Sequence, residues 1–306
     1  MFFTKKYYKP SIEFKIRLSS KVKFFFKKLL PSVLSSGVTQ INILVGTIIA
    51  SFEASAVSYL YYADRIYQIN LAIAGIAVGT VSLPVLSKAF KSKNYSKVTN
   101  IQNKSIQLSL LLSIPASLGL IIASDEIVNG LFGYGSFTLK DVEKTSDALM
   151  FFGYGVIAFA LVKILSNFFF ARDNTKTPFY YSLVSVVINI SISILFFNKV
   201  GFIIIPIATS ISSWVNALLL FSKLYLNNHF NFENIFNIAN LKIILVSTLS
   251  IYIFKILIDL SKDYLFYESN LKLFTIIIVV TITIFIYILM SLLTKTFKYS
   301  DIKLKY

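Results

Sequence analysis

The sequence contains no cysteine, one histidine and few acidic residues. Without cysteine there are no disulfides, no thiolate metal sites and no thiol nucleophiles. His229 lies alone in the polar segment NNHFNFEN, and a single histidine without cysteine does not make a zinc site, so we expect an ordinary surface position for it. No HExxH motif, phosphate-cradling glycine loop or nucleotide-binding motif occurs. These absences argue against an enzyme, a nucleotide-driven pump and a bound metal or other cofactor.

What the sequence has in excess is apolar residues. Hydrophobic residues make up 56% of the chain and charged residues only 14%, with a mean hydropathy of +0.73. The apolar residues form continuous runs of about twenty, the length a helix needs to cross the hydrocarbon core of a bilayer. A transmembrane β-barrel would instead show alternating segments of roughly ten residues. The sequence therefore predicts an all-α polytopic membrane protein.

Eight runs qualify as predicted transmembrane helices. They are Leu30–Ser51, Ile66–Leu86, Ile106–Ala123, Ala148–Phe170, Phe179–Phe197, Phe202–Leu224, Leu241–Leu260 and Leu271–Leu293. The second is the least hydrophobic, and its Gly75, Gly79 and alanines suit close packing against another helix. The segment of about two dozen residues before the fourth run is long enough for a short helix and a turn at Gly133 and Gly135.

Positive charge is distributed unevenly over the connecting segments. If the N-terminal segment is cytoplasmic, 22 of the 30 Lys and Arg residues fall on the cytoplasmic side, six on the opposite side and two within spans. This asymmetry follows the positive-inside rule and predicts that both termini are cytoplasmic. The formal net charge of +16 is then mainly a topology signal, and we expect no nucleic-acid binding.

The first 29 residues interleave Lys and Arg with Phe, Tyr and Ile. Such a pattern is typical of an amphipathic helix that lies against anionic headgroups. A flexible basic leader is the alternative. Charges recur throughout the segment and no small-residue cleavage site follows an apolar core, so a signal peptide is not indicated.

Three charged residues are candidates for ligand contact. Asp64 and Arg65 lie at the edge of the second span, where an ionised side chain is costly unless it faces protein, water or a charged ligand. Neighbouring residues on a helix point in different directions, so we expect separate roles rather than a mutual ion pair. The Arg65 guanidinium suits bidentate phosphate binding, with a structural anchor as the alternative. Lys163, inside the fourth span, is the second cation, with snorkelling to the interface as its alternative.

Other polar residues in the spans have simpler interpretations. Lys255 and Asp259 are four residues apart on the seventh span, a spacing that predicts a local ion pair. The amides of Asn167 and Asn189, with those of Gln40 and Asn42, are expected to bridge helices more than to hold a cation.

Four sequence blocks in a fixed order carry a resemblance to a known family. They are SFEASAVSYLYYADRIYQ, GIAVGTVSLPVLSKAF, LFGYGSFT and VKILSNFFFARDNTKTP. Together they resemble the lipid II flippases of the MurJ (MviN) family, within the multidrug/oligosaccharidyl-lipid/polysaccharide exporter superfamily. The resemblance runs from about Leu30 to Leu293. It implies two six-helix lobes followed by two further helices, and this chain resembles the second lobe (30–226) and the final pair (227–306), preceded by a cytoplasmic leader (1–29).

The resemblance also implies a substrate and its contacts. Arg65 matches the cavity arginine of the YADR motif, Asp64 its preceding aspartate and Lys163 the lysine of VK-x-L. The implied substrate is a lipid-linked peptidoglycan precursor at the bacterial inner membrane, and the implied partners are membrane lipids and a first six-helix lobe. The final two helices would shelter the polyprenyl tail. The first span has no carboxylate, so sodium coupling through that span is not expected.

Two further hypotheses remain at this stage. One is an exporter of another polyprenyl-linked oligosaccharide or of a drug, although a cationic drug would call for cavity carboxylates, which the spans almost lack. The other is a membrane scaffold that transports nothing and whose charges only anchor helices. Retention of a polyprenyl pyrophosphate lipid that depends on Arg65 distinguishes a flippase from a scaffold.

Overall fold

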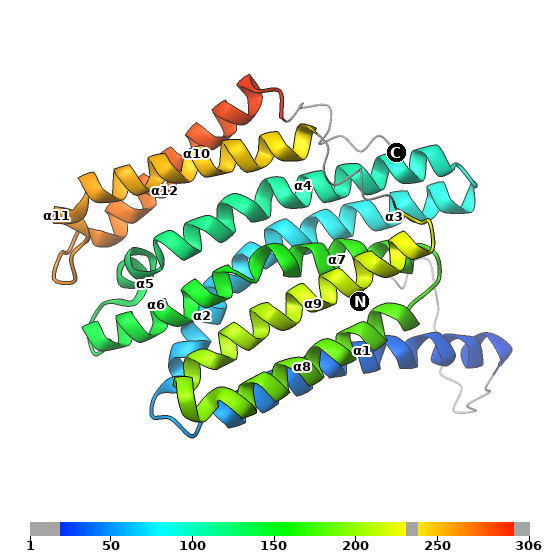
Figure 1. Ribbon diagram of the computed structural model, residues 1–306, viewed down its shortest axis with the longest axis horizontal. Coiled ribbons are helices and arrows are strands. Elements are labelled where there is room, and N and C mark those ends of the chain that lie inside the picture. Colours follow the sequence, from blue (N-terminus) through cyan, green and yellow to red (C-terminus); the bar gives the residue numbers. More distant parts are fainter. Residues whose placement is uncertain (1–18, 231–237, 297–306) are drawn as a thin grey trace, which may run out of the picture.

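The computed structural model describes residues 19–230 and 238–296, and this part of the chain is helical with no strand. In chain order the helices are α1 (Ser20–Ala50), α2 (Ala56–Leu71), η2 (Ala72–Ala77), α3 (Val78–Lys91), α4 (Tyr95–Ile122), α5 (Ser124–Phe132), α6 (Leu139–Gly153), α7 (Val156–Phe170), α8 (Lys176–Val200), η3 (Gly201–Ile203), α9 (Ile204–Leu226), α10 (Ile238–Leu260), α11 (Lys262–Leu265) and α12 (Lys272–Leu293). The long helices lie side by side in one bundle (Figure 1). We call its two ends the α11 end and the α3–α4 end, after the elements found there.

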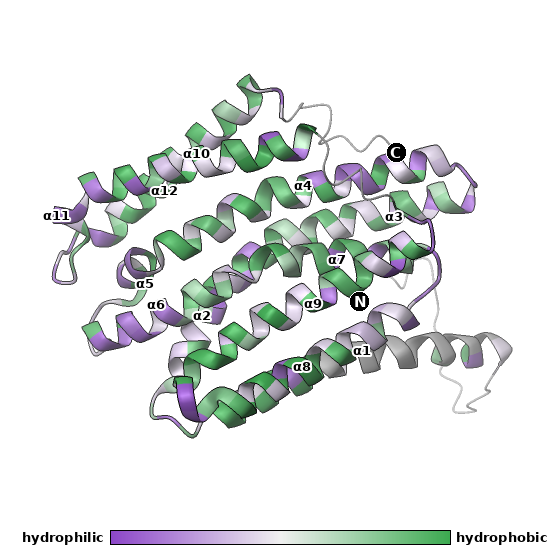
Figure 2. Ribbon diagram, viewed as in Figure 1, coloured by the Kyte–Doolittle hydropathy of each residue, from purple (hydrophilic) through white to green (hydrophobic). Residues whose placement is uncertain are grey.

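Five helical stretches of the described residues are long and apolar enough to cross a membrane. They are Ala56–Lys91, Tyr95–Ile122, Lys176–Leu226, Ile238–Leu260 and Lys272–Leu293. Helices α6 and α7, bent by 41° at their junction, make a sixth if they count as one span. Apolar residues cover these helices, whereas polar residues gather near the turns (Figure 2). The fold class is confirmed, and the number of eight spans stays a prediction.

The 51-residue stretch Lys176–Leu226 is a hairpin rather than a single rod. Helix α8 ends at Gly201, whose φ of +73° lies in the left-handed region that favours glycine, and α9 returns along it (Figure 1). The Asn189 side chain donates from Nδ2 to Thr209 Oγ1 at 3.0 Å and so joins the two helices. Its predicted helix-bridging role is confirmed.

Helix boundaries differ from the predicted runs at the polar ends of helices. Helix α1 begins at Ser20, after Ser19 caps it by accepting from the Val22 N–H at 3.3 Å, so the helix continues across the predicted boundary at residue 29. Residues 1–18 of the predicted leader and 297–306 of the predicted tail lie outside the described residues, and the division into three segments stays a prediction. The second helix begins at Ala56 rather than Ile66, because its first ten residues include polar ones, and hydropathy alone therefore places its start too late.

Helices α2, η2 and α3 form one rod of 36 residues with a π-helical segment in its middle. A methyl group at Gly75 would stand 3.4 Å from the Cα of Ala160, so glycine lets α7 approach closely. At Gly79 the close neighbour is the side chain of Asn167, which donates from Nδ2 to the Gly79 carbonyl at 2.9 Å. The predicted close packing at the two glycines is confirmed, as is the bridging role of Asn167.

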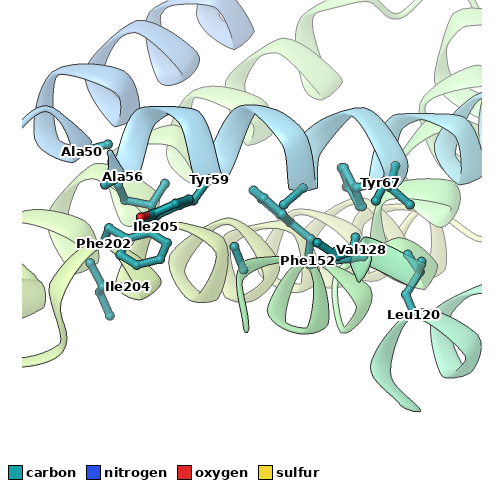
Figure 3. Close-up of a cluster of buried hydrophobic side chains, with 14 of the residues drawn as sticks. Ala50, Ala56, Tyr59, Tyr67, Leu120, Val128, Phe152, Phe202, Ile204 and Ile205 are labelled. Atoms are coloured by element: carbon teal, nitrogen blue, oxygen red, sulfur yellow. The ribbon is translucent and has the colours of Figure 1, made fainter. Parts of the chain in front are cut away.

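The largest buried apolar cluster joins α2 to α6 and α9. The rings of Tyr67 and Phe152 stack with centroids 5.2 Å apart, and Tyr59 packs on Phe202 at 5.6 Å (Figure 3). The Tyr59 hydroxyl also donates to Asp141 Oδ1 at 2.9 Å, on the first turn of α6. These contacts fix the start of the α2 rod, which carries the candidate site.

The last helix pair, α10 and α12, packs on α4 and α5 beside the other helices (Figure 1). Its ion pair differs from the predicted one. Asp259 pairs with Lys262 at 2.9 Å across the end of α10, and not with Lys255. Both partners are exposed, so the pair contributes little to stability.

Candidate functional site

Arg65 lies within helix α2 of the rod rather than at the edge of the span. It follows the start of the helix by nine residues, or about 14 Å. The side chain is exposed and is held by Tyr61, one turn earlier: the guanidinium carbon lies 4.5 Å from the ring centroid and Nη2 donates to the hydroxyl at 3.1 Å. No carboxylate of the described residues lies within salt-bridge distance of Arg65. Most of its hydrogen-bond donors thus remain available to an anion.

Asp64 faces a different neighbour. Its carboxylate accepts a hydrogen bond from the side-chain amide of Gln68, one turn further along α2, and its side chain is half-buried. Asp64 and Arg65 thus form no mutual ion pair, as expected, and their separate roles stay a prediction. The amide partly satisfies the carboxylate, and Arg65 makes no ion pair with it within 4.0 Å.

Lys163 lies on α7, where its exposed side chain passes the π-helical segment of the rod. Its Cγ would be 3.4 Å from a methyl group at Gly75. Gly75 follows Arg65 by ten residues, or about 15 Å along the axis. The structure therefore does not bring Lys163 and Arg65 together at one point, but sets them apart along the same rod.

A stripe of exposed side chains runs along the rod and includes Arg65. Its exposed members are Tyr61, Arg65, Gln68, Ala72, Ile76 and Thr80. Charged and amide groups come first and small or apolar side chains follow. Sequence reasoning missed Tyr61 and Gln68, although their spacing of four from Arg65 and Asp64 could have revealed both. Because the first part of the stripe offers a cation beside hydrogen-bonding groups, it can hold an anionic headgroup.

Another charged contact occurs at the α3–α4 end, in the turn after α7. Arg172 donates from Nη1 to the carbonyl of Phe168 at 2.6 Å and lies 5.2 Å from the ring of Phe90. Next to it His229 is half-buried, so its side chain lies at the surface but is only partly exposed. Burial, together with the charge of Arg172, lowers the pKa of His229, and burial lowers that of Arg172. Arg172 also donates from Nη2 to the backbone carbonyl of His229 at 3.4 Å, whereas Nδ1 of His229 and Nε of Arg172 are buried without a hydrogen-bond partner.

A cavity of about 330 Å³ lies at the α11 end, away from the three predicted site residues. Asp125, Glu126, Asn129 and Tyr267 are among its lining residues. Burial raises the pKa of Glu126. Across the described ranges, no group of three or more His, Asp or Glu residues is arranged to hold a metal ion.

These features define a class: a helical, multi-pass membrane protein with an exposed cation, Arg65, on the stripe along the rod of α2, η2 and α3. Solved structures place the fold more narrowly. A multidrug resistance MATE family transporter of the MOP superfamily, in an outward-facing conformation, matches 85% of this chain and 60% of its own at a TM-score of 0.58. At 18% identity that match shows the fold alone.

A more similar structure is that of a lipid II flippase MurJ in an inward closed conformation. It matches 95% of this chain with a TM-score of 0.72 and 28% identity. A curated relative from Rhizobium meliloti (strain 1021), named "Probable lipid II flippase MurJ", is 40% identical over 213 residues, 70% of this chain. The family model "Lipid II flippase MurJ" matches residues 1–275. The chain belongs to the lipid II flippase MurJ family.

The chain is shorter than these relatives. It spans 40% of the length of the Rhizobium meliloti protein and 58% of the solved MurJ chain. The recognition made from four sequence blocks is confirmed, and the chain corresponds to part of the length of such proteins.

Proposed function

We propose that this chain forms the second lobe and final helix pair of a flippase that moves a lipid-linked peptidoglycan precursor across the bacterial inner membrane. The observation that carries the proposal is the exposed Arg65, which Tyr61 supports and no described carboxylate neutralises. Family membership and the names of the relatives support lipid II as the substrate. A flippase needs no catalytic residues, in keeping with the absence of catalytic motifs from the sequence.

In this proposal Arg65 binds the pyrophosphate of the substrate. Two parallel hydrogen bonds from a guanidinium match two phosphate oxygens, and the low dielectric of a membrane cavity strengthens the attraction. Lys163 adds positive potential about 15 Å further along the rod, where a large headgroup would reach it. Asp64, with Gln68 as its partner, offers acceptors to the sugar or peptide part of the headgroup.

Alternating access requires two lobes that rock against each other, and this chain supplies only the second. We infer that the exposed stripe of the rod faces a first six-helix lobe, because exposed polar groups inside a bilayer need protein or water opposite them. Such a lobe belongs either to the same gene product or to a separate chain. Both termini are cytoplasmic in this arrangement, and α10 and α12 shelter the polyprenyl tail.

Complementation of a flippase-depleted strain tests the proposal. We expect this chain to restore growth only when a first lobe is supplied with it. In the restored pair, Arg65→Ala should abolish growth, and it should weaken retention of a polyprenyl pyrophosphate lipid by about tenfold or more, the cost of a charge-assisted contact. Lys91→Ala, which removes an exposed lysine at the α3–α4 end, is the matched control. Normal growth and retention with Arg65→Ala would show that the anion-binding role is wrong.

A further inference from the structure

The sequence block LFGYGSFT, residues 131–138, comprises the last two residues of α5 and the tight loop that joins α5 to α6, and the proposed transport mechanism does not use it. Two glycines determine its shape. Gly135 has a φ of +61°, and a methyl group at Gly133 would stand 2.7 Å from the carbonyl oxygen of Asn129. The loop also has its own cap, since Thr138 and Asp141 exchange hydrogen bonds at the start of α6. We call this segment the glycine loop.

Lys272, the first residue of α12, is held by the glycine loop. Its side chain is 2% exposed, although an ammonium group is rarely buried without compensation. The Nζ atom donates to the carbonyl oxygens of Gly133 and Tyr267. It also lies 4.3 Å from the ring centroid of Tyr134 and 4.7 Å from that of Tyr267. Carbonyl dipoles and aromatic faces thus replace the water that the ammonium loses.

Two more hydrogen bonds connect the same elements. Tyr267, in the segment between α11 and α12, donates from its hydroxyl to the carbonyl of Phe137 at 2.6 Å. Asn129, at the end of α5, donates from Nδ2 to the carbonyl of Leu265 at 2.8 Å. The side chains of Tyr267 and Lys272 therefore bind both halves of the glycine loop, through hydrogen bonds to the carbonyls of Phe137 and Gly133.

Apolar packing supports this end of the helix pair. Ile276 of α12 lies so close to Gly130 that a methyl group there would stand 2.8 Å from its Cγ2. The surrounding buried cluster joins α5, α10, α11 and α12. Further along the pair, within the described residues, Tyr287 donates to the carbonyl of Leu111 at 2.6 Å and Gln107 to that of Thr296 at 3.1 Å. Ile243 of α10 packs there on Leu111 and Ile114 of α4. The α11 end of the pair is therefore attached both by hydrogen bonds and by apolar packing.

We propose that Lys272 and Tyr267 form a latch that fixes the α11 end of the last helix pair to the glycine loop, so that this end moves with the preceding helices as one body. Because the ammonium is buried, the latch depends on a lysine at residue 272. No apolar residue offers donors to both the Gly133 and Tyr267 carbonyls, and a displaced Lys272 would leave those carbonyls without this partner. The proposal rests on these contacts and not on the identity of the transported lipid.

Hydrogen–deuterium exchange on the full chain in lipid nanodiscs tests the latch. Lys272→Met keeps the length and the apolar stem of the side chain but removes the charge and the donors. We expect amide exchange in residues 131–138 and 262–271 to quicken by about tenfold, since a local opening equilibrium sets the exchange rate. Exchange at the α8–α9 turn, residues 201–203, should not change. Lys262→Met, on the same connecting segment but in an exposed ion pair, is the matched control and should leave both segments as in the parent.

Tyr267→Phe is the second variant, because it removes only the hydroxyl bond to Phe137 and is expected to fold. It should quicken exchange in residues 131–138 by a smaller factor. The latch is overturned if both variants exchange like the parent in these segments. It is also overturned if exchange rises equally at residues 201–203, because that would show a general loss of stability.

Discussion

The side-chain amide of Asn167 donates to the carbonyl oxygen of Gly79 at 2.9 Å, and a methyl group added to Gly79 would stand 2.9 Å from the same amide nitrogen. The hydrogen bond that joins α7 to the rod thus depends on the absence of a side chain at residue 79. Inside a membrane, where apolar burial gives little drive for helices to associate, such close contacts and hydrogen bonds hold helices together.

Gly79→Ala should therefore weaken the contact between α3 and α7. The new methyl group forces Asn167 away from the Gly79 carbonyl, and overpacking of this kind typically costs about 1–3 kcal/mol. The thermal unfolding midpoint in detergent, followed by size-exclusion fluorescence, is expected to fall. Gly37→Ala is the control, because nothing lies within 4 Å of a methyl group there. An unchanged midpoint for Gly79→Ala would contradict the packing role of this glycine.

Tyr61 holds Arg65 by its ring and by its hydroxyl, and two substitutions separate these contributions. Tyr61→Phe keeps the ring and should leave binding of a polyprenyl pyrophosphate lipid within about twofold of the parent. Tyr61→Ala removes both contacts and should weaken binding by about threefold to fivefold, in line with an exposed cation–π interaction of 0.5–1 kcal/mol. Binding is measured by titration of the lipid into the purified chain with its first lobe. Equal losses in both variants would assign the effect to the hydroxyl instead.

Stability should fall with acid because of His229. Burial and the positive charge of Arg172 lower its pKa below the ordinary 6.5. As the pH falls, the unfolded chain binds this proton first, so stability declines from about pH 6.5 down to the folded-state pKa. The unfolding midpoint of the parent should drop between about pH 7.5 and pH 5.5, and His229→Gln should drop less.

Glu126 provides the control for this pH dependence. Burial raises its pKa, so its contribution has the opposite sign and strengthens the fold as the pH falls. Glu126→Gln should therefore make the acid loss steeper. Identical pH profiles for the parent and His229→Gln would rule out the histidine as the cause.

The absence of cysteine makes the predicted orientation simple to test. Ser92 at the α3–α4 turn and Ser136 in the glycine loop are exposed, and a single cysteine at either position can be labelled without background. A membrane-impermeant maleimide added to intact spheroplasts should label Ser136→Cys and spare Ser92→Cys. After the membrane is opened, both should react. The reverse pattern would invert the topology inferred from the Lys and Arg distribution.

Much of the helical framework could be predicted, because apolar runs are local in the sequence and an amide within such a run needs a partner on another helix. Asn189 and Asn167 were expected to join helices, and both do. The starts of helices were less predictable. Hydropathy places the second span at Ile66, but the helix begins at Ala56, since polar residues that face protein or water continue a helix without contributing to an apolar run.

The candidate site shows a similar division. Adjacency on a helix correctly separated Asp64 from Arg65, because direction follows from the helical repeat. The ion pair was not predicted correctly from the sequence. Asp259 pairs with Lys262 rather than Lys255, since the end of α10 brings the later lysine closer. The half-buried position of His229 depends on Arg172, which lies 57 residues earlier, and no local pattern reports such a contact.

The π-helical segment Ala72–Ala77 has a consequence for how the rod tolerates change. A helix turns by about 100° per residue, and a π-helical turn contains more residues than an α-helical turn, so this segment sets the angle between the two ends of the rod. Deletion of one residue there can be absorbed, because a turn that changes from π to α loses about one residue and leaves Arg65 pointing nearly the same way relative to Gly79. Deletion of one residue from the flanking α-helical turns would instead swing Arg65 about a quarter turn around the helix axis. A stretch of the chain that never touches Arg65, and that carries no charge, can thus lose a residue without turning it.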